Sequence, residues 1–162
     1  MAVELYRIDD RLIHGQVVVG WGQPLRIGFI ALIDDDVAAS EWEQELYRMG
    51  VPPDMDVYFA TVDEACSALA EWRADPRPGI VLTGDIATMA RLIEACPEIK
   101  AVNLGGIHHR EGRTIRLRYV YLSPDEEAAL EGLAKRGVVI TAQDVPSARP
   151  IPLPDVLESG GS

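Results

Sequence analysis

The sequence predicts a single-domain α/β protein built on a mainly parallel central sheet with helices on both faces. Strand-like and helix-like patterns alternate through most of its 162 residues. Such repetition requires parallel strands joined by right-handed crossovers, so that helices cover the sheet. The near-continuous apolar run at residues 26–33 is typical of a strand buried on both faces. The length suits one domain with a proper core.

The first third of the chain alternates between strand and helix. The apolar segment at residues 3–8 is expected to be the first strand, and residues 16–21 can begin a helix. The run at residues 26–33 is the second strand. A helix is expected at residues 40–49, because Gly50 and two prolines follow it.

The middle third continues this alternation. Its apolar segments predict strands at residues 55–60, 79–83 and 99–104. Thr61 caps the helix that follows the first of them, since Glu64 stands at capping-box spacing. Another helix is expected at about residues 86–95. The loops that follow these strands should all open at one edge of the sheet.

The last third of the chain departs from this alternation of strands and helices. Residues 114–122 alternate enough to predict a strand or extended chain. A helix then begins at Ser123, with a proline at its first position and Glu126 completing a capping box. Residues 138–142 are expected to form the final strand. The tail at residues 146–162 is rich in Pro, Ser and Gly and is expected to be irregular.

A reactive constellation follows the first strand. Residues 7–16 read Arg-Ile-Asp-Asp-Arg-Leu-Ile-His-Gly-Gln, which places His14 on a strand-to-helix turn with Arg7 and Arg11 before it and Gly15 after it. In α/β sheets such turns lie at the carboxyl edge, where ligands bind. Backbone N–H groups at a helix start favour anions there. Together these residues suggest that His14 receives a phosphoryl group. The alternative is that His14 caps the helix or is a partly buried packing residue.

Composition excludes several classes of protein. The formal net charge of −11 argues against a nucleic-acid binder, because phosphate backbones demand a basic footprint. It also disfavours electrostatic docking on anionic lipid. No uninterrupted apolar run approaches the roughly 20 residues that span a bilayer, and the N-terminus does not resemble a signal peptide. Cys66 and Cys96 lack metal-type spacing and are expected to be reduced thiols of a cytosolic protein.

One segment of this acidic chain is basic. Between His108 and Arg118 a single acid stands among four arginines, namely Arg110, Arg113, Arg116 and Arg118. Together with Arg7, Arg11 and Arg26 they can form a positive face that attracts a phosphate-bearing partner. The alternative is an exposed hairpin whose arginines are merely solvated. His108 and His109 do not predict a metal site, since neighbours on a strand point to opposite faces and zinc needs three or four convergent ligands.

Residues 7–17, which add Val17 to the run above, resemble the signature of the IIB component of the mannose/fructose/sorbose family of the sugar phosphotransferase system (PTS). Further matching segments follow in the expected order at residues 34–38, 102–106 and 137–138. A PTS IIB domain is therefore expected over residues 1–157, with a flexible tail over residues 158–162. The resemblance also implies an antiparallel strand at one edge of the otherwise parallel sheet.

The resemblance implies a phosphoryl carrier, a protein-phosphohistidine–sugar phosphotransferase. His14 would accept a phosphoryl group from the phosphohistidine of a IIA partner and pass it to a sugar held by the membrane-embedded IIC/IID permease. The expected location is cytoplasmic, in peripheral association with that permease, and no cofactor is implied. The oligomeric state stays open, a homo-oligomer included. The identity of the sugar is not readable, because it should depend mainly on the membrane partner.

The neighbours of His14 have supporting roles in this hypothesis. Arg11 is expected to clamp the phosphoryl oxygens, because a guanidinium group offers a planar two-point contact. Asp9 or Asp10 can orient Arg11 or the imidazole of His14; the alternative is that they cap the turn. Backbone N–H groups of residues 12–16 can form an anion-binding nest, and Gly15 permits close backbone approach. The supporting set comprises Arg7, Asp9, Asp10, Leu12, Ile13, Gly15 and Gln16.

Two rival functions remain at this point. One is a regulatory or phosphate-ligand-binding domain of the same fold that phosphorylates no sugar, since fold alone does not determine function. The intact set of Arg11, His14 and Gly15 argues against complete loss of phosphotransfer. The other is a Rossmann-type nucleotide enzyme, but the first β–α turn lacks G-x-G-x-x-G and no G-x-x-x-x-G-K-[ST] loop occurs.

Overall fold

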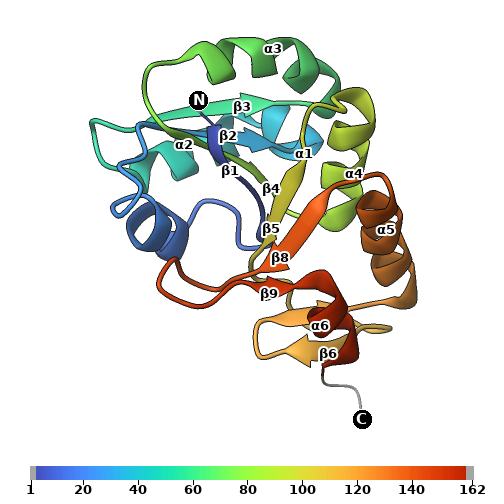
Figure 1. The fold of residues 1–162 in the computed structure, drawn as a ribbon. Helices are drawn as coiled ribbons and strands as arrows, with labels where there is room; N and C mark the ends of the chain where they lie inside the picture. Colours follow the sequence, from blue (N-terminus) through green and yellow to red (C-terminus); the bar gives the residue numbers. More distant parts are fainter. Residues whose placement is uncertain (1–2, 160–162) are drawn as a thin grey trace.

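The structure of the protein is a computed structural model that describes residues 3–159, and its centre is a seven-stranded sheet. The strands are ordered β3-β2-β4-β1-β5-β8-β9, and every neighbouring pair is parallel except β8 and β9 (Figure 1). Their bounds are Val3–Ile8 (β1), Phe29–Ile33 (β2), Asp56–Ala60 (β3), Gly79–Thr83 (β4), Ala101–Leu104 (β5), Val139–Ala142 (β8) and Ile151–Pro152 (β9). The predicted parallel sheet with an antiparallel edge strand is confirmed.

Helices cover both faces of this sheet, as expected (Figure 1). One face carries α3 (Val62–Ala74), α4 (Ile86–Ala95) and α5 (Pro124–Lys135). The other carries η1 (Gln16–Trp21), α1 (Asp35–Ala38) and α2 (Glu41–Met49). In β2, Phe29, Ala31 and Ile33 face the first layer while Ile30 and Leu32 face the second, and all five are fully buried. The continuous apolar run thus reflects a strand covered on both sides.

The capping signals in the sequence operate as predicted. Thr61 and Glu64 form a complete capping box at the start of α3, and Ser123 and Glu126 form another at the start of α5. Each side chain satisfies a backbone N–H that the first helical turn leaves without a partner. Helix α1 was not expected: the turn after β2 continues into it, because the Asp34 side chain accepts a hydrogen bond from the N–H of Val37.

Several expected strand boundaries need correction; the strand predicted at residues 99–104, for example, begins at Ala101. The strand predicted at residues 26–33 begins only at Phe29, because Arg26 has a φ of 54° and the N–H of Ile27 turns back to the carbonyl of Gly22. Residues 114–122 form a separate antiparallel hairpin of β6 (Thr114–Leu117) and β7 (Val120–Leu122).

The tail was expected to be irregular, and this is wrong for residues 151–158. Residues Ile151–Pro152 form the antiparallel edge strand, and α6 (Leu153–Glu158) follows it directly. Leu153 and Val156 are buried one turn apart, so this short helix closes the core despite its prolines, which suit a first helical turn. Of the flexible tail expected at residues 158–162, residues 160–162 lie outside the described part of the chain.

The helix predicted at residues 16–21 is present but is a π-helix. The N–H of Gly22 bonds the carbonyl of Val17, five residues back, and a Cβ at Gly22 would lie 2.1 Å from the carbonyl oxygen of Val18. Glycine is therefore required where this wide turn ends. In an α-helix, two residues five apart in the sequence are separated by about 140° around the helix axis. The wider π-turn reduces this angle, so Gln16 and Trp21 lie closer to one side of η1.

Candidate functional site

The His14 loop lies at the carboxyl edge of the sheet, between the ends of β4 and β5. The N–H of Asp9 bonds the carbonyl of Thr83, where β4 ends. The N–H of Asp10 bonds the carbonyl of Gly106, just beyond β5. Because β1 is central, its loop is held from both sides, which is the position expected of a ligand site in such a sheet.

Asp9 is the centre of this loop. Its side chain is fully buried, and Arg11 binds it through two contacts, Nε to Oδ1 at 3.1 Å and Nη2 to Oδ2 at 3.1 Å. Arg7 reaches Oδ2 from the other side at 3.3 Å. Burial acts to raise the pKa of Asp9, but the hydrogen bonds and charges of Arg11 and Arg7 outweigh it and keep the pKa below its usual value. Asp9 is thus a carboxylate shared by two arginines.

Arg7 lies beneath the site and is fully buried. It donates to the side chain of Asn103 and, at 2.9 Å, to the carbonyl of Gln143, and its guanidinium stacks 4.6 Å from the ring centroid of Trp21. Burial lowers the pKa of Arg7, and the charge of Asp9 opposes that effect. With no exposed surface, Arg7 supports the loop from within the protein.

Arg11 lies nearer the surface, with 34% of its side chain exposed. Beyond Asp9, its Nη1 donates to Oε1 of Gln16 at 3.0 Å. Burial acts to lower the pKa of Arg11, but Asp9 raises it above its usual value. The guanidinium is therefore a fixed positive charge held in one orientation beside the loop.

The imidazole of His14 is held against its own loop. Its Nδ1 lies 2.8 Å from the carbonyl oxygen of Leu12, so Nδ1 carries the proton in this arrangement, because a carbonyl only accepts. The other nitrogen, Nε2, is buried, has no hydrogen-bond partner within residues 3–159, and lies 4.0 Å from Oδ2 of Asp9.

The remaining residues of the loop differ in their environments. Leu12 has a φ of 59°, a left-handed conformation rare for a branched side chain. Ile13 is buried and anchors the loop in the core below. Gly15 is exposed with open space where a Cβ would point, so the structure shows no close approach there. The close approach is at Gly105 instead, where a Cβ would lie 2.3 Å from Nη2 of Arg7 and 2.7 Å from Oδ2 of Asp9.

Asp10 faces away from the two arginines. It accepts hydrogen bonds from the N–H of His108 at 2.7 Å and from Nδ1 of the same residue at 2.5 Å. Asp10 thereby fixes the segment that follows Gly106, and of the two aspartates only Asp9 contacts Arg11. Within residues 3–159, no group of three or more metal-ligating side chains is arranged to hold a metal ion.

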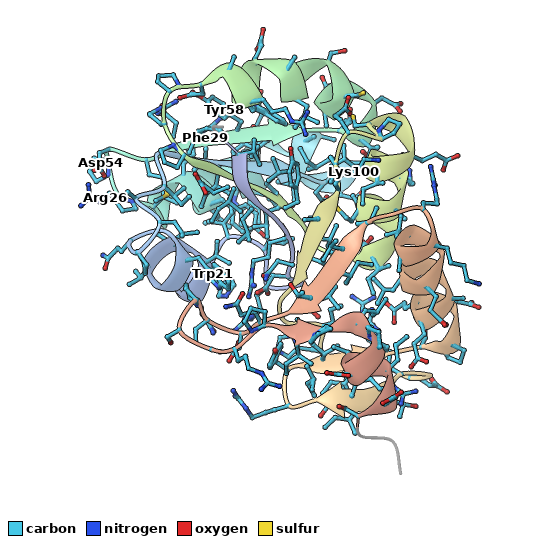
Figure 2. All side chains as sticks on the ribbon, in the orientation of Figure 1. Trp21, Arg26, Phe29, Asp54, Tyr58 and Lys100 are labelled. Atoms are coloured by element: carbon cyan, nitrogen blue, oxygen red, sulfur yellow. The ribbon has the colours of Figure 1, made fainter. Side chains whose placement is uncertain are left out.

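The sequence prediction missed the loop after β8. The carbonyl of Asp144 accepts from Nε1 of Trp21 at 3.1 Å, and its carboxylate accepts from Nε2 of Gln16 at 2.9 Å. Figure 2 labels Trp21 on the side of η1 that faces the sheet. The π-turn makes this double contact possible, since it brings Gln16 and Trp21 toward one side. The sequence did contain a signal that could have placed Asp144 near the site, because residue 144 follows a parallel strand, as His14 does.

Three of the seven arginines expected to form a positive face do not contribute to it as predicted. Arg7 is buried, and Arg113 pairs with Glu126 at 2.6 Å with only 9% of its side chain exposed. Arg116 pairs with Glu127 at 2.7 Å and donates to the carbonyl of Leu157. Arg113 and Arg116 thus join the β6–β7 hairpin to α5 and α6 and are not merely solvated. Arg118 differs, because 82% of its side chain is exposed and it pairs at 3.1 Å with Asp144, which also binds Gln16.

Comparison with known proteins agrees with this architecture. The model of the PTS system sorbose subfamily IIB component matches residues 3–161. The chain belongs to this family. It is 31% identical over 155 residues to the N-acetylgalactosamine-specific phosphotransferase enzyme IIB component 1 of Escherichia coli, covering 93% of this chain and 96% of the relative. The IIBSor domain of the sorbose permease from Klebsiella pneumoniae superposes with a TM-score of 0.87 at 28% identity over 100% of both chains.

A further relative joins two PTS components in one chain. The mannose-specific EIIAB component of Escherichia coli is 27% identical over 157 residues, which cover 97% of this chain and 49% of that protein. This IIB component is therefore a phosphoryl carrier and phosphotransferase of a sugar PTS, a system with IIA and IIC/IID components. Within the described part of the chain, every helix is too short or too polar to cross a bilayer.

Proposed function

We propose that His14 carries the phosphoryl group, receiving it from the phosphohistidine of a IIA component and passing it to a sugar in the IIC/IID permease. The observation that carries this proposal is the arrangement of His14 beside Asp9, which lies 4.0 Å from Nε2 and holds Arg11 in a two-point contact. It brings a nucleophile and a fixed positive charge together at the carboxyl edge of the sheet.

In the first transfer, a nitrogen lone pair of His14 bonds to phosphorus while the P–N bond to the donor imidazole breaks and its electron pair stays on the donor. A neutral imidazole offers one such lone pair. In the resting arrangement Nδ1 is engaged with Leu12 and Nε2 is buried. The ring of His14 therefore has to turn before either nitrogen can meet the phosphorus of the donor.

In the second transfer, a sugar hydroxyl oxygen bonds to phosphorus while the P–N bond breaks and its electron pair returns to His14. The hydroxyl proton passes to solvent or to a base beside the sugar in the permease. Phosphoryl transfer depends mainly on positioning and electrostatic stabilisation. Arg11 supplies the positive charge, and its carboxylate partner keeps the guanidinium in place. Of the N–H groups expected to form the nest, that of Leu12 donates to the carbonyl of Asp9 at 3.0 Å, whereas those of residues 13–16 donate to no acceptor within residues 3–159. We propose that the latter bind the phosphoryl oxygens.

The roles of the other predicted residues follow from their contacts. Arg7 and Ile13 hold the loop from below, and Asp9 orients Arg11. Gln16 links Arg11 to Asp144. We further propose that the protein works on the cytoplasmic side, in peripheral contact with the permease.

A labelling experiment tests the proposal. Incubation with a phosphorylated cognate IIA component should label a single acid-labile, base-stable site. The chain has three histidines, so His14→Ala should abolish the label while His109→Ala keeps it. Circular dichroism should show that both variants are folded. Equal labelling of the folded His14→Ala variant would refute the mechanism.

A further inference from the structure

The helix α2 exposes a stripe of large apolar side chains. Trp42 is 72% exposed, Leu46 49% and Met49 77%, and none of the residues of α2 is buried. Their spacing of four and three residues places them along one side of the helix. Only Tyr47, on another side, packs partly against the core. A surface helix normally turns its apolar stripe to the core, so the outward stripe indicates an interaction surface.

This stripe lies on the same face of the sheet as the helix that follows His14 (Figure 1). That helix, η1, adds Val19, which is 52% exposed. Within residues 3–159 there are six exposed large apolar side chains, and four of them lie on η1 and α2. A partner seated on this face would therefore also be close to the elements that carry the His14 loop.

The charges around the stripe restrict what can cover it. Glu41, Glu43 and Glu45 stand on α2 against the single base Arg48, which pairs with Glu45 at 3.8 Å. An anionic lipid surface would be repelled by these acids and by the net charge of −11. A second copy would bring two acidic helices together. A basic partner complements the surface, and the cytoplasmic loops of membrane proteins carry an excess of Lys and Arg.

We propose that Trp42, Leu46 and Met49 dock onto an apolar segment flanked by Lys and Arg on the cytoplasmic face of the IIC/IID permease. The inference rests on the proposed function, because the permease holds the sugar that accepts the phosphoryl group in the second transfer. The docked protein would be held on its η1–α2 side while His14 delivers the phosphoryl group. The IIA component would not need this stripe.

The test separates the two transfers. A double variant, Leu46→Gln with Met49→Gln, is compared with Val139→Gln, an exposed apolar residue of β8 far along the sheet from α2. With membranes that contain the cognate permease, the apparent KM for the phosphorylated double variant should rise about tenfold or more, because apolar side chains central to an interface dominate binding. The kcat, and the rate of phosphorylation by phospho-IIA, should stay unchanged, and Val139→Gln should behave as the parent.

A charge variant tests the chemistry of the partner. Glu45→Lys should raise the same KM and weaken its dependence on salt.

The proposal is overturned if the double variant keeps the parental KM, or if it loses phosphorylation by IIA to the same extent. It is also overturned if the parent sediments as a dimer that the double variant breaks, or if permease-free vesicles of anionic lipid bind the parent and not the variant. Failure of His14 labelling in the parent would instead refute the proposed function.

Discussion

Arg7 and Asp9 form an ion pair of two fully buried side chains, with 3.3 Å between Nη2 and Oδ2. Asp9 also binds Arg11, so one carboxylate stands between two guanidinium groups. Since one carboxylate neutralises one arginine, the three side chains together keep an excess of positive charge, and Arg11 is the arginine that is exposed. The two arginines of the motif therefore differ in kind: Arg7 is part of the interior, whereas Arg11 presents charge to the site.

Replacing Arg7 should destabilise the fold. Arg7→Met leaves Asp9 with less compensation and removes the donors to Asn103 and Gln143. Removing one partner of a buried ion pair lowers the free energy of unfolding by about 3–5 kcal/mol, because the other charge stays buried without compensation. Urea unfolding followed by circular dichroism measures the loss. Arg110→Met, at an exposed arginine of the same chain, is the control and should change the free energy of unfolding little.

Replacing Arg11 should slow transfer in a protein that still folds, with some loss of stability because buried Asp9 loses its two-point partner. Arg11→Ala is expected to reduce the phosphorylation rate by about 100- to 1,000-fold, the effect of removing one preorganised electrostatic donor. Arg11→Lys should recover only part of it, since an ammonium group cannot make the two-point contact with Asp9. Rapid-quench measurement with phospho-IIA gives the rates. Parental rates in a folded Arg11→Ala variant would show that the residue is structural.

Gly105 is expected to tolerate no side chain. A Cβ there would lie 2.3 Å from Nη2 of Arg7 and 2.7 Å from Oδ2 of Asp9, so Gly105→Ala must displace the buried pair. The expected cost is about 1–3 kcal/mol of overpacking, with slower transfer because Arg11 shares Asp9. Gly132→Ala in α5 is the matched control, since no atom lies within 4 Å of its Cβ position. It should stabilise the protein by about 0.5–1 kcal/mol, and equal thermal shifts in both variants would contradict the argument.

Local sequence patterns predicted the fold well where one physical signal dominates. The buried run of β2 and the capping boxes at Thr61 and Ser123 were readable, because burial and capping are encoded within a few residues. The strand and helix of residues 151–158 were not, since Leu153 and Val156 are sparse among prolines and gain their burial only from tertiary packing.

The candidate site was predictable in part for the same reason. His14 and Arg11 stand together in one loop, whereas Asn103 and Asp144 come from β5 and the loop after β8. The sequence shows that these residues follow or end parallel strands, but it does not show that Arg7 and Gln16 reach them. The π-turn is similarly invisible to a helical periodicity, although the glycine at position 22 accompanies it.

Arg113 should prove to be a structural residue. Arg113→Glu would place two carboxylates together at the start of α5, where Nη2 now lies 2.6 Å from Oε2 of Glu126. Like charges in a half-buried position repel, so the melting temperature should fall, and the salt dependence of phosphorylation by IIA should stay parental. Restored stability in Arg113→Glu combined with Glu126→Arg would support direct pairing. A parental melting temperature together with a weaker salt dependence would instead support the expectation that Arg113 belongs to a positive face that attracts the phosphorylated IIA component.

The same pair should contribute to acid sensitivity. Burial acts to raise the pKa of Glu126, but the hydrogen bonds from Arg113 and from the N–H of Ser123 outweigh it and hold the pKa below its usual value. A carboxyl whose pKa is lower in the folded state stabilises the fold above its unfolded pKa, about 4.3 for Glu. That contribution is lost as the pH falls through this value toward the folded pKa. Glu126→Gln preserves the capping-box geometry but cannot ionise. Urea unfolding between pH 7 and pH 3 should therefore show a shallower loss of stability in Glu126→Gln than in the parent, and identical slopes would rule out a contribution from this pair.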